Sequence, residues 1–207
     1  MVNGWNKTMI KLLPHIDAIK NNQQVKGIYL YGEFGIGKTY AMNQLLEETK
    51  KVQVINGNVE NTTFSEYRGY LIVWPTLINE LKQNMNNKDS TTYYQHDWKK
   101  FINCQILIID DIGGEIASDW ELREILFPLL NNRIEKKLTT FFTSNFSIKE
   151  LTNHYLKKSD VITVGRVIDR IRGLTQEVLL TGENLRRNSW NDDSTIDLSK
   201  LEHKRKM

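Results

Sequence analysis

The most informative segment of the sequence is Gly32-Glu33-Phe34-Gly35-Ile36-Gly37-Lys38-Thr39. It matches the pattern G-x-x-x-x-G-K-[ST], and it stands between a short apolar run and a helical pattern. Glycines let the backbone curl so that successive N–H groups face phosphate oxygens, and the N-terminus of the following helix adds positive potential. We therefore predict a nucleotide-binding loop here rather than an ordinary glycine turn.

Two side chains of this loop have distinct expected roles. Lys38 is expected to reach the β- and γ-phosphates, and the Thr39 hydroxyl is expected to ligate Mg²⁺. Most other contacts come from backbone N–H groups, so the whole segment belongs to the predicted site. The predicted nucleotide-binding residues are Gly32, Glu33, Phe34, Gly35, Ile36, Gly37, Lys38, Thr39 and Tyr40.

A second motif is Ile106-Leu107-Ile108-Ile109-Asp110-Asp111. An apolar strand that ends in carboxylates delivers them to the carboxyl edge of a parallel sheet, where α/β folds bind ligands. Asp110 is expected to hold Mg²⁺, and Asp111 to orient or deprotonate the attacking water. Adjacent carboxylates also occur in capping turns, but the phosphate loop in the same chain favours the catalytic interpretation. Because Asp111 is shorter than the Glu common at this position, we expect slow turnover.

Two further segments carry polar groups that suit phosphate chemistry. One ends in Asn145, which is expected to contact the γ-phosphate or the attacking water, although Asn after a strand is also common in turns. The other contains Arg166 and Arg170, which are four residues apart and share one helix face, where they can bind one anion. The alternative is a solvent-exposed face paired with Asp169. If either arginine reaches a neighbouring subunit's nucleotide, the subunits must associate head to tail.

The chain as a whole alternates strand and helix patterns. We predict strands at 27–31, 70–74, 105–110, 138–143 and 177–180. We predict helices within 1–26, at 38–50, from Pro75, at 119–136 with a kink at Pro128, at 147–155 with a Ser147–Glu150 capping box, and at 164–173. The strands are near-continuous apolar runs, which indicates an α/β fold with a parallel sheet covered on both faces. The polar segment 53–69 is expected to form a loop or an insertion, and the polar segment 84–94 is expected to be exposed.

Composition narrows the class of protein. The chain has 207 residues, of which 40% are hydrophobic and 26% charged, and its formal net charge is +3. These values fit one globular domain and exclude collagen-like and wholly disordered chains. No apolar run approaches the roughly 18 residues that span a bilayer, no secretory signal opens the chain, and Cys104 is a lone cysteine, so we expect a cytoplasmic protein. Basic residues gather in the last quarter, which equally fits a nucleic-acid contact or a solvated tail.

These motifs, in this order, resemble those of the AAA+ ATPases, and they look most like the bacterial replicative helicase loaders of the DnaC/DnaI type. The resemblance covers residues 25–187, approximately. It is carried by Tyr29–Tyr40, Leu107–Glu115, Thr140–Phe146, Arg166–Arg172 and Thr181–Arg187. The first two segments are shared with the wider P-loop class, whereas the Asp-Asp-Ile-Gly-Gly-Glu and Phe-Phe-Thr-Ser-Asn sequences are closer to the loaders.

The resemblance implies a P-loop NTPase with a five-stranded parallel sheet of order 5-1-4-3-2 and an ATP site between subunits. It implies a sensor-1 role for Asn145, an arginine-finger role for Arg170 with Arg166 beside it, and a sensor-2 role for Arg186 or Arg187. The implied catalytic residues are Lys38, Asp110, Asp111, Asn145, Arg166 and Arg170. The implied function is ATP- and Mg²⁺-dependent loading of the hexameric replicative helicase onto single-stranded DNA by a head-to-tail homo-oligomer.

The implied domain organisation is an N-terminal helix and linker at 1–26, an ATPase domain at 27–187 and a polar, flexible tail at 188–207. Helicase loaders usually carry an N-terminal helicase-binding domain, whereas residues 1–26 alone precede the first predicted strand here. The sequence is therefore either the ATPase core of a longer protein or a short relative. Residues 53–69 are longer than the family's usual connection after the first helix of the ATPase domain.

Other functions share parts of this pattern. An IstB-like transposition helper ATPase has the same core and differs in its transposase partner. A P-loop kinase needs an acceptor pocket and an arginine-rich lid, for which residues 166–172 are a candidate. A nucleotide switch needs no hydrolysis, which suits Asp111 in place of Glu. Tyr93, Tyr94 and Trp98 can stack on bases, but half-buried packing with a charged rim is the favoured interpretation.

Overall fold

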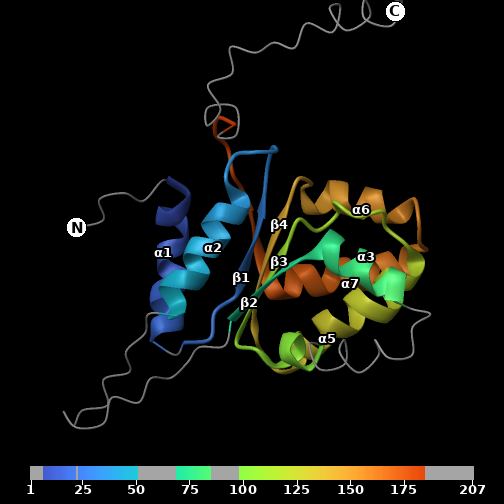
Figure 1. Cartoon of the computed structure of the whole chain (residues 1–207), viewed down its shortest axis with the longest axis horizontal. Coiled ribbons are helices and arrows are strands. Elements are labelled where there is room, and N and C mark those ends of the chain that lie inside the picture. The colour runs from blue at the N-terminus through green and yellow to red at the C-terminus, as the bar shows by residue number, and fades with distance from the viewer. Residues whose placement is uncertain (1–6, 22, 51–68, 85–97, 185–207) are drawn as a thin grey trace, which may run out of the picture.

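The computed structural model describes residues 7–21, 23–50, 69–84 and 98–184. Strands and helices alternate along these ranges (Figure 1). The strands are β1 (Gly27–Tyr31), β2 (Gly69–Val73), β3 (Ile106–Asp110), β4 (Thr139–Ser144) and β5 (Thr175–Leu179). The helices are α1 (Lys7–Lys20), α2 (Lys38–Lys50), α3 (Trp74–Asn84), α5 (Phe127–Glu135), α6 (Ile148–Leu156) and α7 (Val161–Leu174), with a π-helical turn, η1 (Glu121–Leu126), directly before α5. No helix in the described ranges is long and apolar enough to cross a membrane.

The strands form one parallel sheet in the order β2-β3-β4-β1-β5. Read from the other edge, this is 5-1-4-3-2, the order that the resemblance implies, and each neighbouring pair is parallel. In the register of β1, Leu30 stands opposite Thr143 of β4 on one side and Val178 of β5 on the other. The carboxyl ends of the strands therefore share one edge of the sheet, where the loops that follow β1, β3 and β4 come together.

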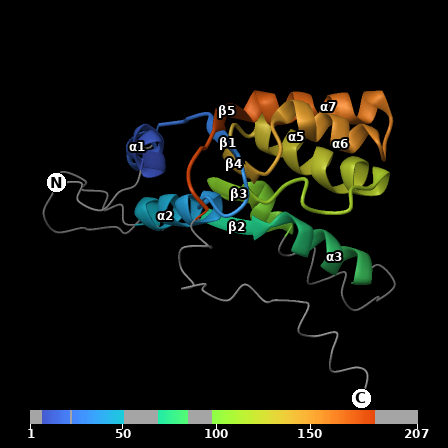
Figure 2. The ribbon, with the colours of Figure 1, turned by 90° about the horizontal axis from the view of Figure 1, so that it is seen from above.

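Helices cover both faces of the sheet, as predicted. α1 and α2 lie on one side, and α3, α5, α6 and α7 lie on the other (Figure 1, Figure 2). Successive strand side chains point to opposite faces, so alternate residues enter different cores. Ile106 and Ile108 belong to the core under α1 and α2, whereas Leu107 and Ile109 belong to the core under the larger helical layer. Burial on both faces explains why β1 and β3 are nearly continuous apolar runs, whereas the edge strand β5 carries Gln176 and Glu177 and is largely exposed.

Several element boundaries differ from the prediction, and three of the differences have a clear physical cause. Trp74 begins α3 rather than ending β2, so Pro75 occupies the second helical position, where its missing N–H breaks no intrahelical bond. α7 begins before the predicted residue 164 because Asp160 caps it, accepting from the N–H groups of Ile162 and Thr163 at 2.9 and 3.0 Å. β5 lies at 175–179 rather than 177–180, because it pairs along the whole length of β1.

The predicted kink at Pro128 takes the form of the π-helical turn η1, so the helix expected over 119–136 is divided before Phe127. Proline has no N–H, so the carbonyl four residues earlier loses its partner. The backbone hydrogen-bond pattern of the helix changes one residue before the proline. There the Phe127 N–H donates to the carbonyl of Leu122, five residues earlier, instead of four residues earlier as in an α-helix. This wider turn begins at Glu121, whose side chain is buried.

Two other predictions are confirmed, and several fall outside the described chain. The Ser147–Glu150 capping box is present at the start of α6, with both reciprocal hydrogen bonds. Trp98 packs against the core, as the packing interpretation of that aromatic expects. The predictions for residues 53–68, 85–94 and 188–207, which include Tyr93 and Tyr94, lie outside the described residues.

Candidate active site

A pocket of about 580 Å³ opens at the carboxyl edge of the sheet, over the ends of β1, β3 and β4. It is lined by Phe34, Gly35, Gly37, Lys38, Thr39, Tyr40, Val73, Asp110, Asp111, Thr143 and Asn145. The pocket thus brings together residues from the phosphate loop, the Asp110–Asp111 motif and the polar end of β4. Its size suits a nucleotide, and open α/β sheets bind ligands at this edge.

Lys38 begins α2, and its side chain turns back over the phosphate loop. Its Nζ donates to the carbonyl oxygens of Gly32 and Glu33 at 2.8 and 2.7 Å, and to Asn145 Oδ1 at 2.8 Å. Three acceptors match the three N–H donors of the ammonium group, which keeps a buried lysine charged. A fixed positive charge therefore lies beside a helix N-terminus, and both features favour phosphate binding.

Thr39 and Asp110 lie against each other in the pocket. Thr39 Oγ1 donates to the Asp110 carboxylate and is 3.0 Å from each of its oxygens. Thr143 Oγ1 donates to Asp110 Oδ1 at 2.6 Å and fixes the carboxylate from the side of β4. A hydroxyl and a carboxylate are hard oxygen donors that fit Mg²⁺, which leaves its other positions to water and phosphate. Within the described ranges, no three His, Cys, Asp or Glu side chains form an all-protein metal site.

Asp111 has an unusual backbone, with a φ of 59°. This left-handed region is uncommon outside glycine, and such residues gather at functional sites. The Asp111 N–H donates to Thr143 Oγ1 at 2.9 Å, and its Oδ1 accepts from Asn145 Nδ2 at 3.0 Å. Asn145 also accepts a hydrogen bond from Lys38. Its amide group therefore holds the Lys38 ammonium group and the Asp111 carboxylate at a fixed separation.

Two loop glycines are required by the segment that follows β5. A Cβ on Gly32, which has a φ of 152°, would stand 2.2 Å from the Leu180 carbonyl oxygen. A Cβ on Gly35, which has a φ of 77°, would stand 2.2 Å from Asn184 Oδ1. The Leu180 N–H also donates to the Tyr31 carbonyl at 2.7 Å. The segment 180–184 therefore crosses directly over the phosphate loop.

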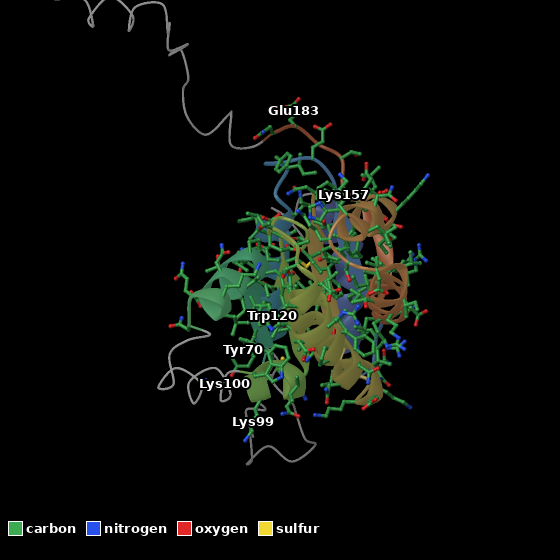
Figure 3. The ribbon with its side chains drawn as sticks, turned by 90° about the vertical axis from the view of Figure 1, so that its right-hand side faces the viewer. Tyr70, Lys99, Lys100, Trp120, Lys157 and Glu183 are labelled. Atoms are coloured by element: carbon green, nitrogen blue, oxygen red, sulfur yellow. The ribbon has the colours of Figure 1, made fainter. Side chains whose placement is uncertain are left out.

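This crossing brings the end of the described chain to the nucleotide side of the molecule. Figure 3 shows Glu183 at the upper end of the molecule and Lys99 and Lys100 at the lower end. The predicted sensor-2 residues, Arg186 and Arg187, come shortly after Glu183 in the sequence and lie outside the described residues.

The other predicted loop residues divide into two groups. The side chains of Phe34 and Tyr40 line the pocket and are 70% and 58% exposed, an unusual exposure for aromatic residues. Ile36 is buried in the core under α1 and α2, so only its backbone is available to a ligand.

Arg166 and Arg170 lie on α7, away from the residues that line the pocket. Arg170 Nε donates to Asn131 Oδ1 at 3.0 Å, Nη1 pairs with Asp169 at 2.7 Å, and the guanidinium lies 5.6 Å from the centre of the Phe127 ring. Arg166 is exposed. The structure therefore does not bring these arginines to the pocket of their own chain, and a role for them in catalysis requires a second subunit.

Two features of the site were not predicted. Thr143 fixes both Asp110 and Asp111, and its signal in the sequence is its position in the polar end of β4, next to Asn145. Glu115 and Glu121 are buried behind the Asp111 loop. Glu115 is the last residue of the Asp-Asp-Ile-Gly-Gly-Glu sequence, but no pattern predicts that either glutamate is buried, because charged residues in a turn and on a helix ordinarily face water.

A family model named the bacterial DnaA ATPase domain matches residues 6–169 of this sequence. The chain belongs to the bacterial DnaA ATPase-domain family. The matched region contains the phosphate loop, both strand-end carboxylates and Asn145, and it ends just before Arg170. Nucleotide binding at the pocket is therefore expected of the chain as a family member, in agreement with the placement of Lys38 and Thr39.

The chain is also similar to proteins and structures described as helicase loaders. The replicative helicase loader DnaI of Bacillus subtilis (strain 168) is 31% identical over 165 residues, which are 78% of this chain and 48% of DnaI. The chain thus spans about half the length of that relative. A crystal structure of DnaI has a TM-score of 0.66 at 26% identity and covers 89% of this chain and 88% of that one. The DnaC helicase loader shares the fold, with a TM-score of 0.62, 21% identity and coverage of 86% and 92%.

Proposed function

We propose that the chain is a Mg²⁺-dependent ATPase that loads a replicative helicase onto single-stranded DNA. The observation that carries this proposal is the convergence on one pocket of Lys38, the Thr39–Asp110 pair and the Asp111–Asn145 pair. A loop that only bound nucleotide would need no carboxylate held beside the Lys38 ammonium group. Similarity to DnaI supports the helicase-loading part of the proposal. Because the matched region covers only 48% of DnaI, we assign to this chain the step of helicase loading that nucleotide controls.

Each group has one task in this proposal. Lys38 and the N–H groups of the loop neutralise the phosphate chain. Bound Mg²⁺ supplies Lewis-acid stabilisation of the phosphate oxygens, and Thr39 and Asp110 would hold it. Asp111 orients the attacking water and accepts its proton. Asn145 keeps Asp111 at its distance from Lys38, so that base and phosphate remain aligned.

Asp111→Asn tests the assignment of the base. The substitution keeps the shape of the side chain and the backbone bond to Thr143 but removes the charge, so ATP affinity should stay at the wild-type value. We expect turnover to fall about a hundredfold, the usual contribution of a positioned base. Steady-state phosphate release and equilibrium ATP binding measure the two quantities. Asp17→Asn, on the exposed side of α1, is the matched control. Wild-type turnover in Asp111→Asn would remove Asp111 from the mechanism.

The head-to-tail part of the proposal predicts that ATP turnover depends on protein concentration. Because Arg170 does not line the pocket of its own chain, turnover should rise more steeply than linearly with protein and should respond to single-stranded DNA. Arg170→Ala should keep ATP binding and lose this cooperative rise, whereas Arg172→Ala, exposed on the same helix, should behave as wild type. A rate proportional to protein and indifferent to DNA would instead indicate a self-contained site, as in a kinase.

A further inference from the structure

Four polar side chains meet in the core behind the loop that follows β3. They come from that loop, from η1, from α3 and from α6, and they are Glu115, Glu121, Trp74 and Tyr155. Glu115 accepts hydrogen bonds from Tyr155 Oη at 3.1 Å and from the Gly113 N–H at 2.8 Å. Glu121 accepts one from Trp74 Nε1 at 2.7 Å. The proposed mechanism uses none of these groups, although two of them are carboxyl groups at most 6% exposed.

Two carboxyl groups buried together need either a cation or a proton. Within the described ranges, no Lys or Arg forms an ion pair with Glu115 or Glu121. Lys82 of α3 donates instead to the Ile116 carbonyl at 3.2 Å. Among the described residues, no N–H or O–H donor faces Glu121 Oε2, which is buried. A proton on Glu121 removes this deficit, because the carboxylic acid then donates to the Glu115 carboxylate.

The electrostatic surroundings agree with this assignment. Burial and, to a smaller degree, the negative charge of Glu115 raise the pKa of Glu121 to about 8, while the hydrogen bond from Trp74 and the field of Lys82 oppose the rise. Burial also raises the pKa of Glu115, but its hydrogen-bond donors favour the charged form. The Tyr155 hydroxyl, which donates to Glu115, and the Tyr29 hydroxyl, which donates to the Phe146 carbonyl, stay protonated because burial raises the pKa of each. At neutral pH the pair therefore holds one proton and one negative charge.

We propose that this proton-sharing pair, Glu115 and Glu121, positions Asp111 by fixing the loop between β3 and η1. Its kinetic consequence rests on the proposed ATPase function, but its structural consequence does not. The Glu115 side chain holds the loop through the Gly113 N–H, and the Glu121 side chain holds Glu115 against η1. The pair thus connects the residue that orients water to a helix outside the nucleotide pocket.

The opposite side of the same loop is fixed by β4. The Ile112 N–H donates to the Thr143 carbonyl at 3.0 Å, and Ser144 Oγ donates to the Ile112 carbonyl at 2.7 Å. The loop closes on itself where the Gly114 N–H donates to the Asp111 carbonyl at 3.0 Å. Asp111 therefore keeps its left-handed backbone only while both sides of the loop are held.

Loss of the proton shared by Glu115 and Glu121 should release the side of the β3–η1 loop that this pair holds. Two negative charges would then face each other in the core, and the loop must move to bring one of them to water. Glu121 binds its proton more tightly in the folded chain than in the unfolded one, where its pKa is about 4.3. The stabilisation from this proton is therefore complete below that pH and is lost as the pH rises through about 8.

The first test observes the pair without nucleotide. In ¹H–¹⁵N spectra of the full chain, the indole N–H of Trp74, assigned with Trp74→Phe, and the amides of Gly113 and Asp111 should titrate together, with a midpoint near pH 8. Glu121→Gln keeps a hydrogen bond to Glu115 without the ionisation, so these resonances should stay flat. Titration of the indole without the Asp111 amide, or flat resonances in the wild type, would overturn the proposal.

Two further variants keep this test decisive. Glu124→Gln, on the exposed side of η1, is the matched control and should titrate like the wild type. If Glu121→Gln does not fold, Tyr155→Phe serves in its place. It removes one donor from the Glu115 carboxylate, so the pair should bind its proton more tightly and the midpoint should move to higher pH. An unchanged midpoint in Tyr155→Phe would contradict the shared proton.

The second test follows the same change in ATP turnover. Wild-type kcat should fall about tenfold by pH 9, one unit above the pKa of Glu121, while the Kd for ATP stays constant. Glu121→Gln should lack this fall, whereas a merely structural pair would change stability without separating the two pH profiles. Equal alkaline falls in both proteins would overturn the positioning role. If the wild type has no turnover at any pH, the proposed ATPase function fails, and the Asp111 amide titration still decides the inference.

Discussion

Lys38→Ala is expected to abolish ATP turnover, with a loss of at least about a thousandfold. The wild-type ammonium is fixed by the Gly32 and Glu33 carbonyls and by Asn145, so its charge stands in place before the nucleotide binds. Alanine removes that charge and also removes the partner that orients Asn145, which in turn holds Asp111. Phosphate release measures the turnover, and calorimetric titration should show weaker ATP binding.

Two variants separate this effect from general loss of charge. Lys149→Ala, exposed on α6, should retain wild-type turnover. Lys38→Arg keeps the charge but replaces a compact ammonium with a planar fork that does not fit three converging acceptors, so it should remain nearly inactive. Folding is checked by circular dichroism, which should show the wild-type spectrum for all three. More than a tenth of wild-type turnover in Lys38→Ala would show that the backbone N–H groups suffice for the phosphate chain.

The phosphate loop could be predicted from the sequence because its chemistry is local. The glycines, Lys38 and Thr39 are contiguous, and the backbone they require is set by the residues themselves. The same holds for the two carboxylates at the end of β3. They directly follow its apolar run, and the carboxyl end of a buried parallel strand is where ligands bind. Strand order is different. Leu30 pairs with Thr143 and Val178, which are distant in sequence, and only the family resemblance supplied that order.

Three parts of the structure depend on long-range packing and could not be predicted in this way. The hydroxyl of Thr143 acquires its role only when β4 lies beside β3. Glu115 and Glu121 are buried by α3 and α6, which approach from distant parts of the chain. Arg133 is fully buried whereas the apolar residue after it, Ile134, is only partly buried, which is the reverse of what hydrophobicity alone predicts for these two positions.

Arg133 connects three elements at the amino end of β4. Its Nη1 donates to the carbonyls of Phe101 and Cys104 at 2.6 and 3.0 Å. These two residues lie at the end of the helical residues 98–103, just before β3. Its Nη2 donates to the Thr139 carbonyl at 2.7 Å, and its Nε donates to Thr140 Oγ1 at 2.8 Å. No carboxylate of the described chain forms an ion pair with it. The charge is thus stabilised by oxygen dipoles and by Cys104 Sγ, which lies 3.4 Å from Nη1. The same hydrogen bonds satisfy carbonyls that a helix end leaves free.

Arg133→Met is therefore expected to lower the free energy of unfolding by about 3–5 kcal/mol, because it leaves these buried acceptors without donors. The melting temperature should fall by roughly 10 °C. Arg133→Lys restores the charge but not the planar fork, so it should recover only part of the loss. Urea unfolding measures the difference, with Arg172→Met, exposed on α7, as the matched control. ATP affinity should persist below the melting transition, since Arg133 contacts the opposite end of β4 from the pocket. A loss below about 1 kcal/mol would mean that water reaches the freed carbonyls, and that the three elements do not depend on this guanidinium.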